Sequence, residues 1–476
     1  MTIRYDMPSR YLIPVVLEID YIDPLKMFSL FAGEPWAVFL DSARVMGRLG
    51  RYSFIAIDPF RTLSSKNGRI LYGDEVLYGD PFSILQEELR KHSMDPIVDL
   101  APFQGGAAGY FAYDLCHHIE KLPRFNVDDM SFPDMAVGFY DLVIGFDQHL
   151  KRGWIISNGY PEREPELRYA RAQKRCQWLV NRLSDVPELP PLTQSICGAD
   201  KITANFSRED YEKAVQRTID YIYAGDIFEA NLSQRFFAPL PDGMTPFQLY
   251  RRLRTLNAAP FAAFINAVTT VIASASPERF LRVNNDGHVE TRPIKGTRPR
   301  GQTHEQDEAR AQELRTSEKD WAENVMIVDL MRNDLSRVCR DHSINVTQLC
   351  GLETYETVHH LVSAVVGILR EGADAVDLLR ATFPGGSITG APKIRAMEII
   401  AEIEPTSRGP YCGSIGYLGF NGEMDTSITI RTYAIKKNIV TFQAGGAIVA
   451  DSDPALEYQE TLDKARALQE ALLRAV

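Results

Sequence analysis

The pattern of apolar and polar positions predicts strands and turns in the first part of the chain, with occasional helices. Residues 37–40 form a short apolar run, and the strand-like residues 51–57 end at an Asp-Pro turn signal. Residues 164–183 carry apolar side chains at helical spacing, which predicts an amphipathic helix.

A proline-rich linker candidate lies at residues 186–194. It divides the chain into two regions of sequence, 1–190 and 195–476, rather than into units that fold independently. After it, Ser207 is a candidate N-cap, an apolar stripe at helical spacing follows, and Gly225 closes the predicted helix.

Strand-like segments dominate the second region. Residues 228–236 alternate, residues 262–273 are predicted as one strand, and residues 280–283 as another strand before a turn. No internal repeat or low-complexity tract is visible. The pattern is strand-rich around a few helices.

One stretch, residues 290–301, presents a lysine between two prolines and among three arginines, Arg292, Arg298 and Arg300. The prolines restrict φ on either side of Lys295, and the following glycine permits close backbone approach, so we expect a stiffened loop. A lysine becomes nucleophilic when burial or neighbouring cations lower its pKa. From this stretch alone, a solvated surface turn with an inert lysine is the favoured alternative.

Two predicted helices each carry acidic residues three positions apart. Asp320 and Glu323 lie in a helix near residues 316–338, and Glu457 and Glu460 follow an Asp-Pro helix start. This spacing places each pair on one helical face. The pairs are ordinary acidic surfaces if both are exposed; if the faces converge, four carboxylates suit Mg²⁺.

Composition and charge exclude several classes of function. The 476 residues are 45% hydrophobic, enough for a large core, and the net charge of −11 argues against a nucleic-acid partner. No apolar run approaches the roughly 20 residues that span a bilayer, and we expect no signal peptide. The six cysteines show no CxxC spacing, which predicts neither disulfides nor a thiolate metal site and favours the cytoplasm.

Several further segments are candidates for ligand contact. The glycines of residues 102–114 favour close backbone packing over a phosphate cradle, because no Lys-Ser/Thr follows them. The glycine-rich turn of residues 383–393 runs into a helix whose N–H groups can receive an anion, and residues 444–447 are similarly small. Arg431 is placed in an alternating strand as a carboxylate partner, and His360 follows a second histidine before an apolar run.

Several stretches, in this order, resemble the chorismate-utilising enzymes. They are residues 293–301, 322–335, 383–393 and 457–461. Upstream segments resemble the N-terminal portion of anthranilate synthase component I and of its relative, the large subunit of aminodeoxychorismate synthase. Region 1–190 then corresponds to that portion, and region 195–476 to a chorismate-binding catalytic region. With the strand-rich pattern, the resemblance implies an α+β fold: two interlocked antiparallel-sheet subdomains that form a β-sandwich with flanking helices.

The lysine selects a branch of this family. Anthranilate and salicylate enzymes carry alanine in the Pro-Ile-x-Gly-Thr motif, whereas aminodeoxychorismate synthase carries lysine, as Lys295 does here. The resemblance implies that this amine attacks C2 of chorismate and expels the C4 hydroxyl, and that ammonia adds at C4 and releases the lysine. The product is 4-amino-4-deoxychorismate, for 4-aminobenzoate and folate synthesis. Glu278 matches the acid that protonates the departing hydroxyl.

The resemblance also assigns binding residues. Glu323 and Glu460 match Mg²⁺ ligands, with Asp320 and Glu457 acting directly or through water. The groups that hold or line the substrate are Thr297, His360, Tyr411, Arg431, Gly445, Gly446 and Lys464. A tryptophan site, regulatory or structural, is similar to Ser42, Arg51, Tyr52 and Ser53. Glu229 departs from the pattern, because nitrogen-adding members usually have glutamine there and water-adding members lysine.

No glutaminase motif is present, so the resemblance implies that a separate glutamine amidotransferase subunit supplies ammonia. The alternative enzyme is anthranilate synthase component I, whose product also requires loss of pyruvate. A non-enzyme alternative is an inactive regulatory paralogue that binds chorismate or tryptophan. The presence of Glu278, Lys295, Glu323 and Glu460 disfavours that alternative.

Overall fold

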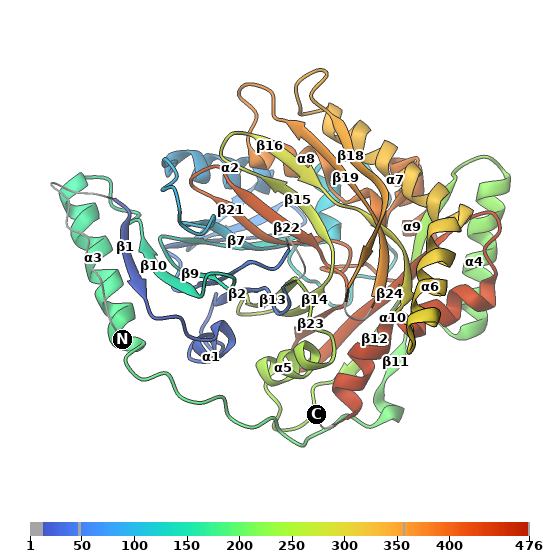
Figure 1. Cartoon of the computed structure of the whole chain (residues 1–476), viewed down its shortest axis with the longest axis horizontal. Helices are drawn as coiled ribbons and strands as arrows, with labels where there is room; N and C mark the ends of the chain where they lie inside the picture. The colour runs from blue at the N-terminus through green and yellow to red at the C-terminus, as the bar shows by residue number, and fades with distance from the viewer. Residues whose placement is uncertain (1–12, 46–48, 356–357, 475–476) are drawn as a thin grey trace.

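Two antiparallel sheets form the centre of the molecule, and helices cover their outer faces (Figure 1). The computed structural model describes residues 13–45, 49–355 and 358–474. Within these residues each sheet has twelve strands. The predicted α+β sandwich with two interlocked antiparallel sheets is confirmed.

The first sheet contains strands from both sides of the linker. In spatial order they are β1 (Val15–Ile19), β10 (Arg152–Ser157), β9 (Leu142–Asp147), β3 (Tyr52–Ala56), β2 (Val38–Asp41), β13 (Phe261–Asn266), β14 (Val271–Ser276), β23 (Thr432–Lys436), β24 (Ile439–Ile448), β12 (Glu229–Pro239) and β11 (Thr203–Ala204), and β20 (Gly390–Ala391) pairs with β12.

The second sheet also contains strands from both sides of the linker. Its order is β17 (Ile294–Pro299), β19 (Val358–Ile368), β16 (His288–Thr291), β15 (Arg279–Val283), β22 (Met424–Ile428), β21 (Ser414–Gly419), β7 (Gly106–Phe111), β8 (Met135–Tyr140), β4 (Arg61–Lys66), β5 (Arg69–Tyr72) and β6 (Glu75–Tyr78), and β18 (Asn345–Thr354) pairs with β19. Blue β7 therefore lies beside red-orange β21 in Figure 1.

Ten helices occur in the described part of the chain. They are α1 (Pro24–Phe28), α2 (Pro81–Lys91), α3 (Pro165–Arg182), α4 (Arg208–Tyr223), α5 (Pro246–Leu256), α6 (His304–Thr316), α7 (Glu318–Ser336), α8 (Ala375–Thr382), α9 (Lys393–Ile403) and α10 (Pro454–Leu473). No helix within the described ranges is both apolar and long enough to cross a membrane.

Apolar clusters between the sheets, on their outer faces, and between α4, α9 and β12 hold these elements together. Side chains such as Phe54 and Ile265 of the first sheet meet Tyr110 and Tyr417 of the second between the two sheets. Helices α1, α3, α5 and α10 pack on the outer face of the first sheet, and α2, α7 and α8 on that of the second. Removing these side chains from water contributes about 25 cal/mol per Å² of apolar surface.

Helices α4 and α10 begin at residues whose side chains cap them. Ser207 accepts the backbone N–H of Asp210 at the start of α4, and Asp453 accepts those of Ala455 and Leu456 at the start of α10. Each cap satisfies N–H groups that lack partners inside the helix. The helix ends predicted at Ser207 and Asp453 are therefore confirmed.

Three local predictions are wrong. Residues 262–273 form not one strand but the hairpin of β13 and β14, because the chain reverses at Val268, with φ +63°, without glycine or proline. Residues 294–299 are not a loop, because their backbone pairs with β19, whose partner residues lie 59 to 68 positions away in the chain. Arg431 follows β22 in a left-handed conformation, with φ +54°, and not in an alternating strand.

The predicted close packing of residues 102–114 is confirmed. A Cβ on Gly106 would lie 2.2 Å from the Leu418 carbonyl oxygen, and one on Gly109 would lie 2.1 Å from that of Ala136. These glycines let β7 lie between β21 and β8. The six cysteines, all among the described residues, are buried and form no disulfide.

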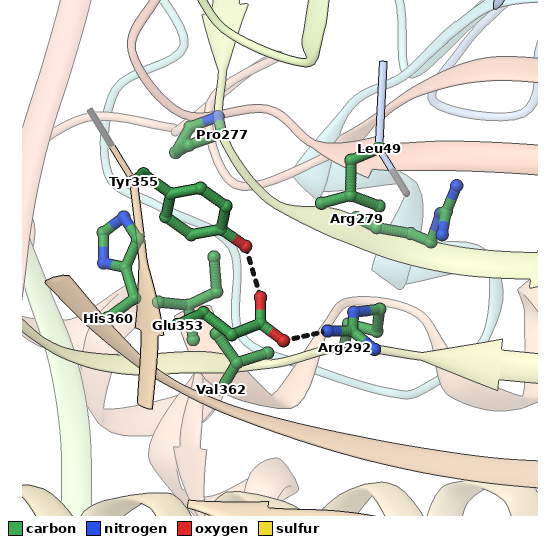
Figure 2. A pocket seen from close by; sticks show the side chains of 9 residues that line it. Leu49, Pro277, Arg279, Arg292, Glu353, Tyr355, His360 and Val362 are labelled. Atoms are coloured by element: carbon green, nitrogen blue, oxygen red, sulfur yellow. Dashed lines mark hydrogen bonds and ion pairs between the residues drawn. The ribbon is translucent and has the colours of Figure 1, made fainter. Parts of the chain in front are cut away.

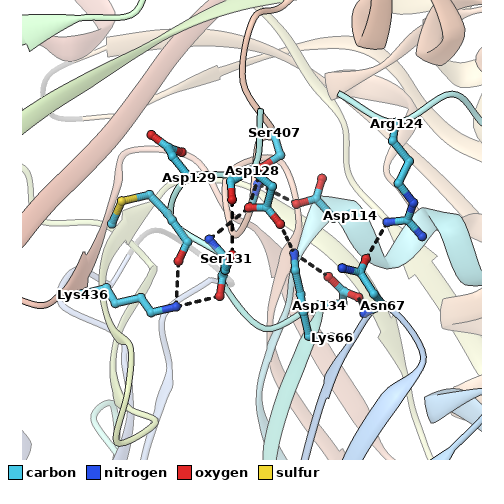
Figure 3. Close-up of polar contacts among 12 residues, drawn as sticks. Lys66, Asn67, Asp114, Arg124, Asp128, Asp129, Ser131, Asp134, Ser407 and Lys436 are labelled. Carbon is cyan, nitrogen blue, oxygen red and sulfur yellow. Dashed lines mark hydrogen bonds and ion pairs between the residues drawn. The ribbon is translucent and has the colours of Figure 1, made fainter. Parts of the chain in front are cut away.

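A polar cluster lies at the end of β4 (Figure 3). Lys66 Nζ lies 2.7 Å from Asp128 Oδ2 and 3.2 Å from Asp134 Oδ1. The backbone N–H of Gly409 donates to Asp114 Oδ2 over 3.2 Å, and Asp114 Oδ1 has no hydrogen-bond partner. Burial raises the pKa of Asp114 to about 7. The cluster thus links the N-terminal strands to a C-terminal segment.

Candidate active site

Lys295 lies in β17 at one edge of the second sheet. Its backbone pairs with Leu361, and the register shifts at Gly296, where φ is +78°. A Cβ on Gly296 would lie 2.9 Å from Asp320 Oδ1 and from Leu314 Cδ1. The backbone angle and the packing against α6 and α7 both favour glycine here. This bulge fixes the position of the neighbouring lysine.

The amino group of Lys295 reaches across to the first sheet. Its Nζ donates to Glu229 Oε1 over 2.8 Å, and Glu323 Oε2 is 3.9 Å away. Lys295 is 9% exposed and Glu229 is fully buried, so the surface-turn alternative is wrong. Burial lowers the pKa of Lys295, but the charges of Glu229 and Glu323 outweigh it, and the pKa lies above its ordinary value.

The arginines around Lys295 have other partners. Arg292 pairs with Glu353, Arg298 with Glu313 and Asp320, and Arg300 with Asp307. The expectation that these cations crowd Lys295 and lower its pKa is therefore wrong for the ligand-free protein. Carboxylates surround the amine instead.

Glu278 lies between β14 and β15, within reach of the charge on Lys295. It is 6% exposed, and Ser387 Oγ donates to its Oε1 over 2.8 Å. Burial raises the pKa of Glu278 to about 7, although hydrogen bonds from Ser387 and from the Ile294 backbone, and the charges of Lys295 and Lys464, oppose this effect. A carboxyl with such a pKa can donate a proton near neutral pH.

The two acidic helix faces are turned toward the same lysines. Glu323 lies on α7, and burial raises its pKa to about 7 despite the opposing charge of Lys295. On α10, burial raises the pKa of Glu460, but Lys464 at 2.6 Å and the charges of Lys319 and Lys295 outweigh it, so the pKa is below its ordinary value. The charge of Lys295 thus acts on a carboxylate of each helix.

Glu457 and Glu460 both lie beside Gly446 of β24. A Cβ on Gly446 would lie 3.1 Å from Glu457 Oε2 and 3.4 Å from Glu460 Oε2. Ser452 Oγ donates to Glu457 Oε1 over 2.7 Å, whereas Glu457 Oε2 is buried without a hydrogen-bond partner. Glycine at this position therefore leaves room for both carboxylates.

The donor chemistry of this region fits a hard cation, because Asp320, Glu323, Glu457 and Glu460 offer only oxygen atoms and Glu457 Oε2 lacks a partner. As the side chains stand, however, no three His, Cys, Asp or Glu residues in the described part of the chain gather closely enough to hold a metal. Asp320 Oδ2 instead accepts from Arg298 over 3.1 Å.

His360 and Thr297 face each other across β19 and β17. Thr297 Oγ1 and His360 Nδ1 are 2.8 Å apart. Burial lowers the pKa of His360 to about 4, so the imidazole is neutral at pH 7. A neutral ring can donate from one nitrogen and accept at the other.

A pocket adjoins His360 on the side toward Leu49 (Figure 2). It is lined by Leu49, Pro277, Arg279, Arg292, Ile294, Glu353, Tyr355, His360 and Val362. Figure 2 shows that Glu353 accepts from both the Tyr355 hydroxyl and Arg292. His360 thus belongs both to this pocket and to the contact with Thr297.

The other predicted substrate groups lie on β24, on α10, before β21 (Tyr411) and between β22 and β23 (Arg431). Lys464 Nζ donates to the Gly445 carbonyl oxygen over 2.8 Å, and Arg431 Nη1 donates to the Lys464 carbonyl oxygen. Tyr411 is buried, and burial raises the pKa of its hydroxyl. Lys464 therefore connects Gly445, Glu460 and Arg431.

The residues of the candidate tryptophan-binding site form a separate group of polar contacts. Ser42 N–H donates to Ser53 Oγ over 3.0 Å, and Ser42 Oγ donates to the Tyr52 carbonyl oxygen over 2.5 Å. Arg51 pairs with Asp147 at 2.6 Å. In the ligand-free protein the Ser42 contacts join the end of β2 to β3, and the Arg51–Asp147 pair joins the start of β3 to β9.

Two contacts of the site were not expected from the sequence. One is the ion pair of Glu229 with Lys295, and the other is the hydrogen bond of Ser387 with Glu278. Each joins residues far apart in the chain, so no local spacing signals it.

The fold and site define a chorismate-utilising enzyme, and the chain belongs to the chorismate binding enzyme family, whose model matches residues 38–470. It is 42% identical to anthranilate synthase component 1 of Thermus thermophilus, over 95% of this chain and 96% of that protein. It is also 42% identical to aminodeoxychorismate synthase component 1 of Salmonella typhimurium, over 90% and 91%.

Among solved structures, anthranilate synthase component I from Streptococcus pneumoniae matches with a TM-score of 0.79 and 34% identity. The match covers 90% of this chain and 94% of that chain. Because relatives with two different products are equally similar, overall similarity defines the family and the site residues must define the product.

Proposed function

We propose that this protein is component 1 of an aminodeoxychorismate synthase, which converts chorismate and ammonia to 4-amino-4-deoxychorismate for 4-aminobenzoate and folate synthesis. The observation that carries the proposal is the buried amine of Lys295, within the electrostatic reach of Glu278. A covalent lysine intermediate divides one difficult displacement into two steps.

In the first step the amine of Lys295 attacks C2 of chorismate, and the C4 hydroxyl leaves as water with the proton of Glu278. Attack requires an amine that has lost its extra proton, and Glu229 Oε1, at 2.8 Å, is the nearest acceptor. In the second step ammonia bonds to C4, and the C2–nitrogen bond to Lys295 breaks. The lysine is thereby restored, and the proton that the nitrogen loses after bonding to C4 returns to Glu278.

The substrate is a dicarboxylate and needs cationic and hydrogen-bonding partners. We assign this role to Arg431, Lys464, Tyr411 and the backbone at residues 445–446, with Thr297 and His360 along the cavity wall. Magnesium would be held by Glu323 and Glu460, with Glu457 and Asp320 direct or through water. Mg²⁺ would supply positive charge for a substrate carboxylate.

The ammonia source is a separate glutamine amidotransferase subunit, and the complex acts in the cytoplasm. The proposal is supported by the similar proteins, which are named component 1 and therefore imply a second component. Free ammonium can replace that subunit as the ammonia source in vitro.

Product analysis tests the proposal. Purified protein with chorismate, Mg²⁺ and ammonium should form aminodeoxychorismate, measured as 4-aminobenzoate after addition of a lyase. Lys295→Ala should abolish this product. Anthranilate as the main product would instead establish the second candidate, anthranilate synthase component 1, which the similarity to the Thermus thermophilus protein favours. A tryptophan site at Ser42 and residues 51–53 would then be tested by adding tryptophan.

A further inference from the structure

The glycine-rich segment of residues 383–393 supplies a hydroxyl group to Glu278. Its short 3-10 helix, Gly386–Ile388, places Ser387 so that Oγ donates to Glu278 Oε1 over 2.8 Å. The sequence suggested that this turn receives an anion at backbone N–H groups. In the ligand-free protein, its contact with the candidate acid is made by a side chain.

Close packing holds this turn in place. A Cβ on Gly385 would lie 2.7 Å from Ile428 Cδ1, and one on Gly386 would lie 2.7 Å from Met331 Cε. Thr389 Oγ1 also donates to the Gly385 carbonyl oxygen over 3.0 Å. Glycines therefore let the turn fit between β22 and α7, and the position of the serine is determined by its surroundings.

The backbone of Glu278 is held as well. Its carbonyl oxygen accepts from the Ile428 N–H over 3.1 Å, and Ser276 Oγ donates to the Ile428 carbonyl oxygen. The backbone of Glu278 is thus held in place, and Ser387 binds one of the two carboxyl oxygens of its side chain. When Glu278 is neutral, an oxygen that accepts this hydrogen bond is the carbonyl oxygen, so the acidic proton lies on the other oxygen.

We propose that Ser387 is a positioning residue. Its hydroxyl donates a hydrogen bond to Oε1 of Glu278, so the acidic proton is carried on Oε2 and faces the departing hydroxyl of the substrate. The inference rests on the proposed function in one respect, the role of Glu278 as the acid. It assigns a role to the glycine-rich turn.

The charges around Glu278 set the expected pH response. Lys295 of β17 and Lys464 of α10 face it from other elements, and the buried Cys412 thiol lies near it. Its neighbour Arg279 pairs with Asp425 instead. The acid must be protonated to act, so activity should fall as pH rises through the pKa of about 7. Loss of the Ser387 hydrogen bond destabilises the carboxylate and moves this fall to higher pH.

The experiment measures kcat and KM for chorismate against pH in wild type, Ser387→Ala and Ser387→Thr. Ser387→Ala should shift the alkaline limb of the pH profile upward and lower the maximal kcat about tenfold, with KM unchanged, because a misdirected proton slows the chemical step. Ser387→Thr keeps the hydroxyl and should restore both. Ser336→Ala, on the exposed end of α7, is the matched control.

Thermal unfolding shows whether each variant is folded, and Ser387→Cys, a weaker donor of similar size, replaces Ser387→Ala if that protein does not fold. If Ser387→Ala, or Ser387→Cys in its place, is folded and its activity falls at the same alkaline pH as that of wild type, the inference is overturned. Glu278→Gln separates the two proposals: if it is inactive while the Ser387 variants are unchanged, the inference alone fails. If Glu278→Gln keeps full activity, the acid assignment and the inference fail together.

Discussion

The amine of Lys295 and the carboxylate of Glu229 lie 2.8 Å apart and join the two sheets through the interior of the protein. Lys295 comes from β17 of the second sheet, and Glu229 begins β12 of the first. The negative charge of Glu229 raises the pKa of the amine, so the ligand-free enzyme holds an ammonium group where the proposed reaction needs an amine. Substrate binding must therefore be coupled to loss of a proton.

Glu229→Gln should make that amine available at lower pH. The amide keeps a hydrogen-bond acceptor but removes one of the negative charges that oppose the effect of burial, so the pKa of Lys295 falls. We expect the covalent substrate adduct, detected by intact-protein mass under turnover, to form about one pH unit lower than in wild type. Lys295→Ala should show no adduct. An unchanged pH dependence of adduct formation in Glu229→Gln would contradict this account.

The acidic helix faces predict a dependence on magnesium. Glu323→Ala combined with Glu460→Ala removes one carboxylate from each helix, and activity at saturating Mg²⁺ should fall at least about a hundredfold. Titration with Mg²⁺, followed by initial rates, measures the effect. Glu308→Ala changes an exposed acid of α6 that pairs with Arg315 and serves as the control. Metal-dependent activity at the wild-type level in the double variant would exclude these ligands.

Gly296→Ala should lower both stability and activity. Alanine disfavours the φ of +78°, and its Cβ would meet Asp320 and Leu314, at a combined cost of about 1–3 kcal/mol. Gly225→Ala is a matched control, because Gly225 has a φ of +85° with nothing within 4 Å of its added Cβ. Thermal unfolding should show the larger loss for Gly296→Ala, and equal losses would show that the packing is unimportant.

The cluster around Asp114 predicts a pH dependence of stability. Its pKa is raised from 3.8 to about 7 by burial, so the folded protein binds a proton more tightly than the unfolded chain. Stability from this group is present below pH 3.8 and declines as pH rises to about 7. Asp114→Asn should flatten the slope of unfolding free energy in this window, measured by denaturant titration. A slope equal to that of wild type would contradict the raised pKa.

Local features of the chain were predictable because nearby residues cause them. The start of α10 follows from Asp453, whose carboxylate accepts the first N–H groups, and β7 requires glycine because neighbouring carbonyl oxygens approach it closely. By contrast, β17 was expected as a loop. Its hydrogen-bonding partner, β19, begins at Val358, and a strand is stabilised only when such a partner is present.

The sequence by itself determined the chemical groups that the protein can use: one lysine in a Pro/Gly segment, one candidate acid, and two helices with acidic faces. These depend on residue type and on spacing along a single element. Tertiary structure alone decided which charges meet, because Glu229 lies 66 residues from Lys295 and Ser387 lies 109 residues from Glu278. The pKa of a buried group depends on those neighbours, so the protonation state of Lys295 could be read only from the folded chain.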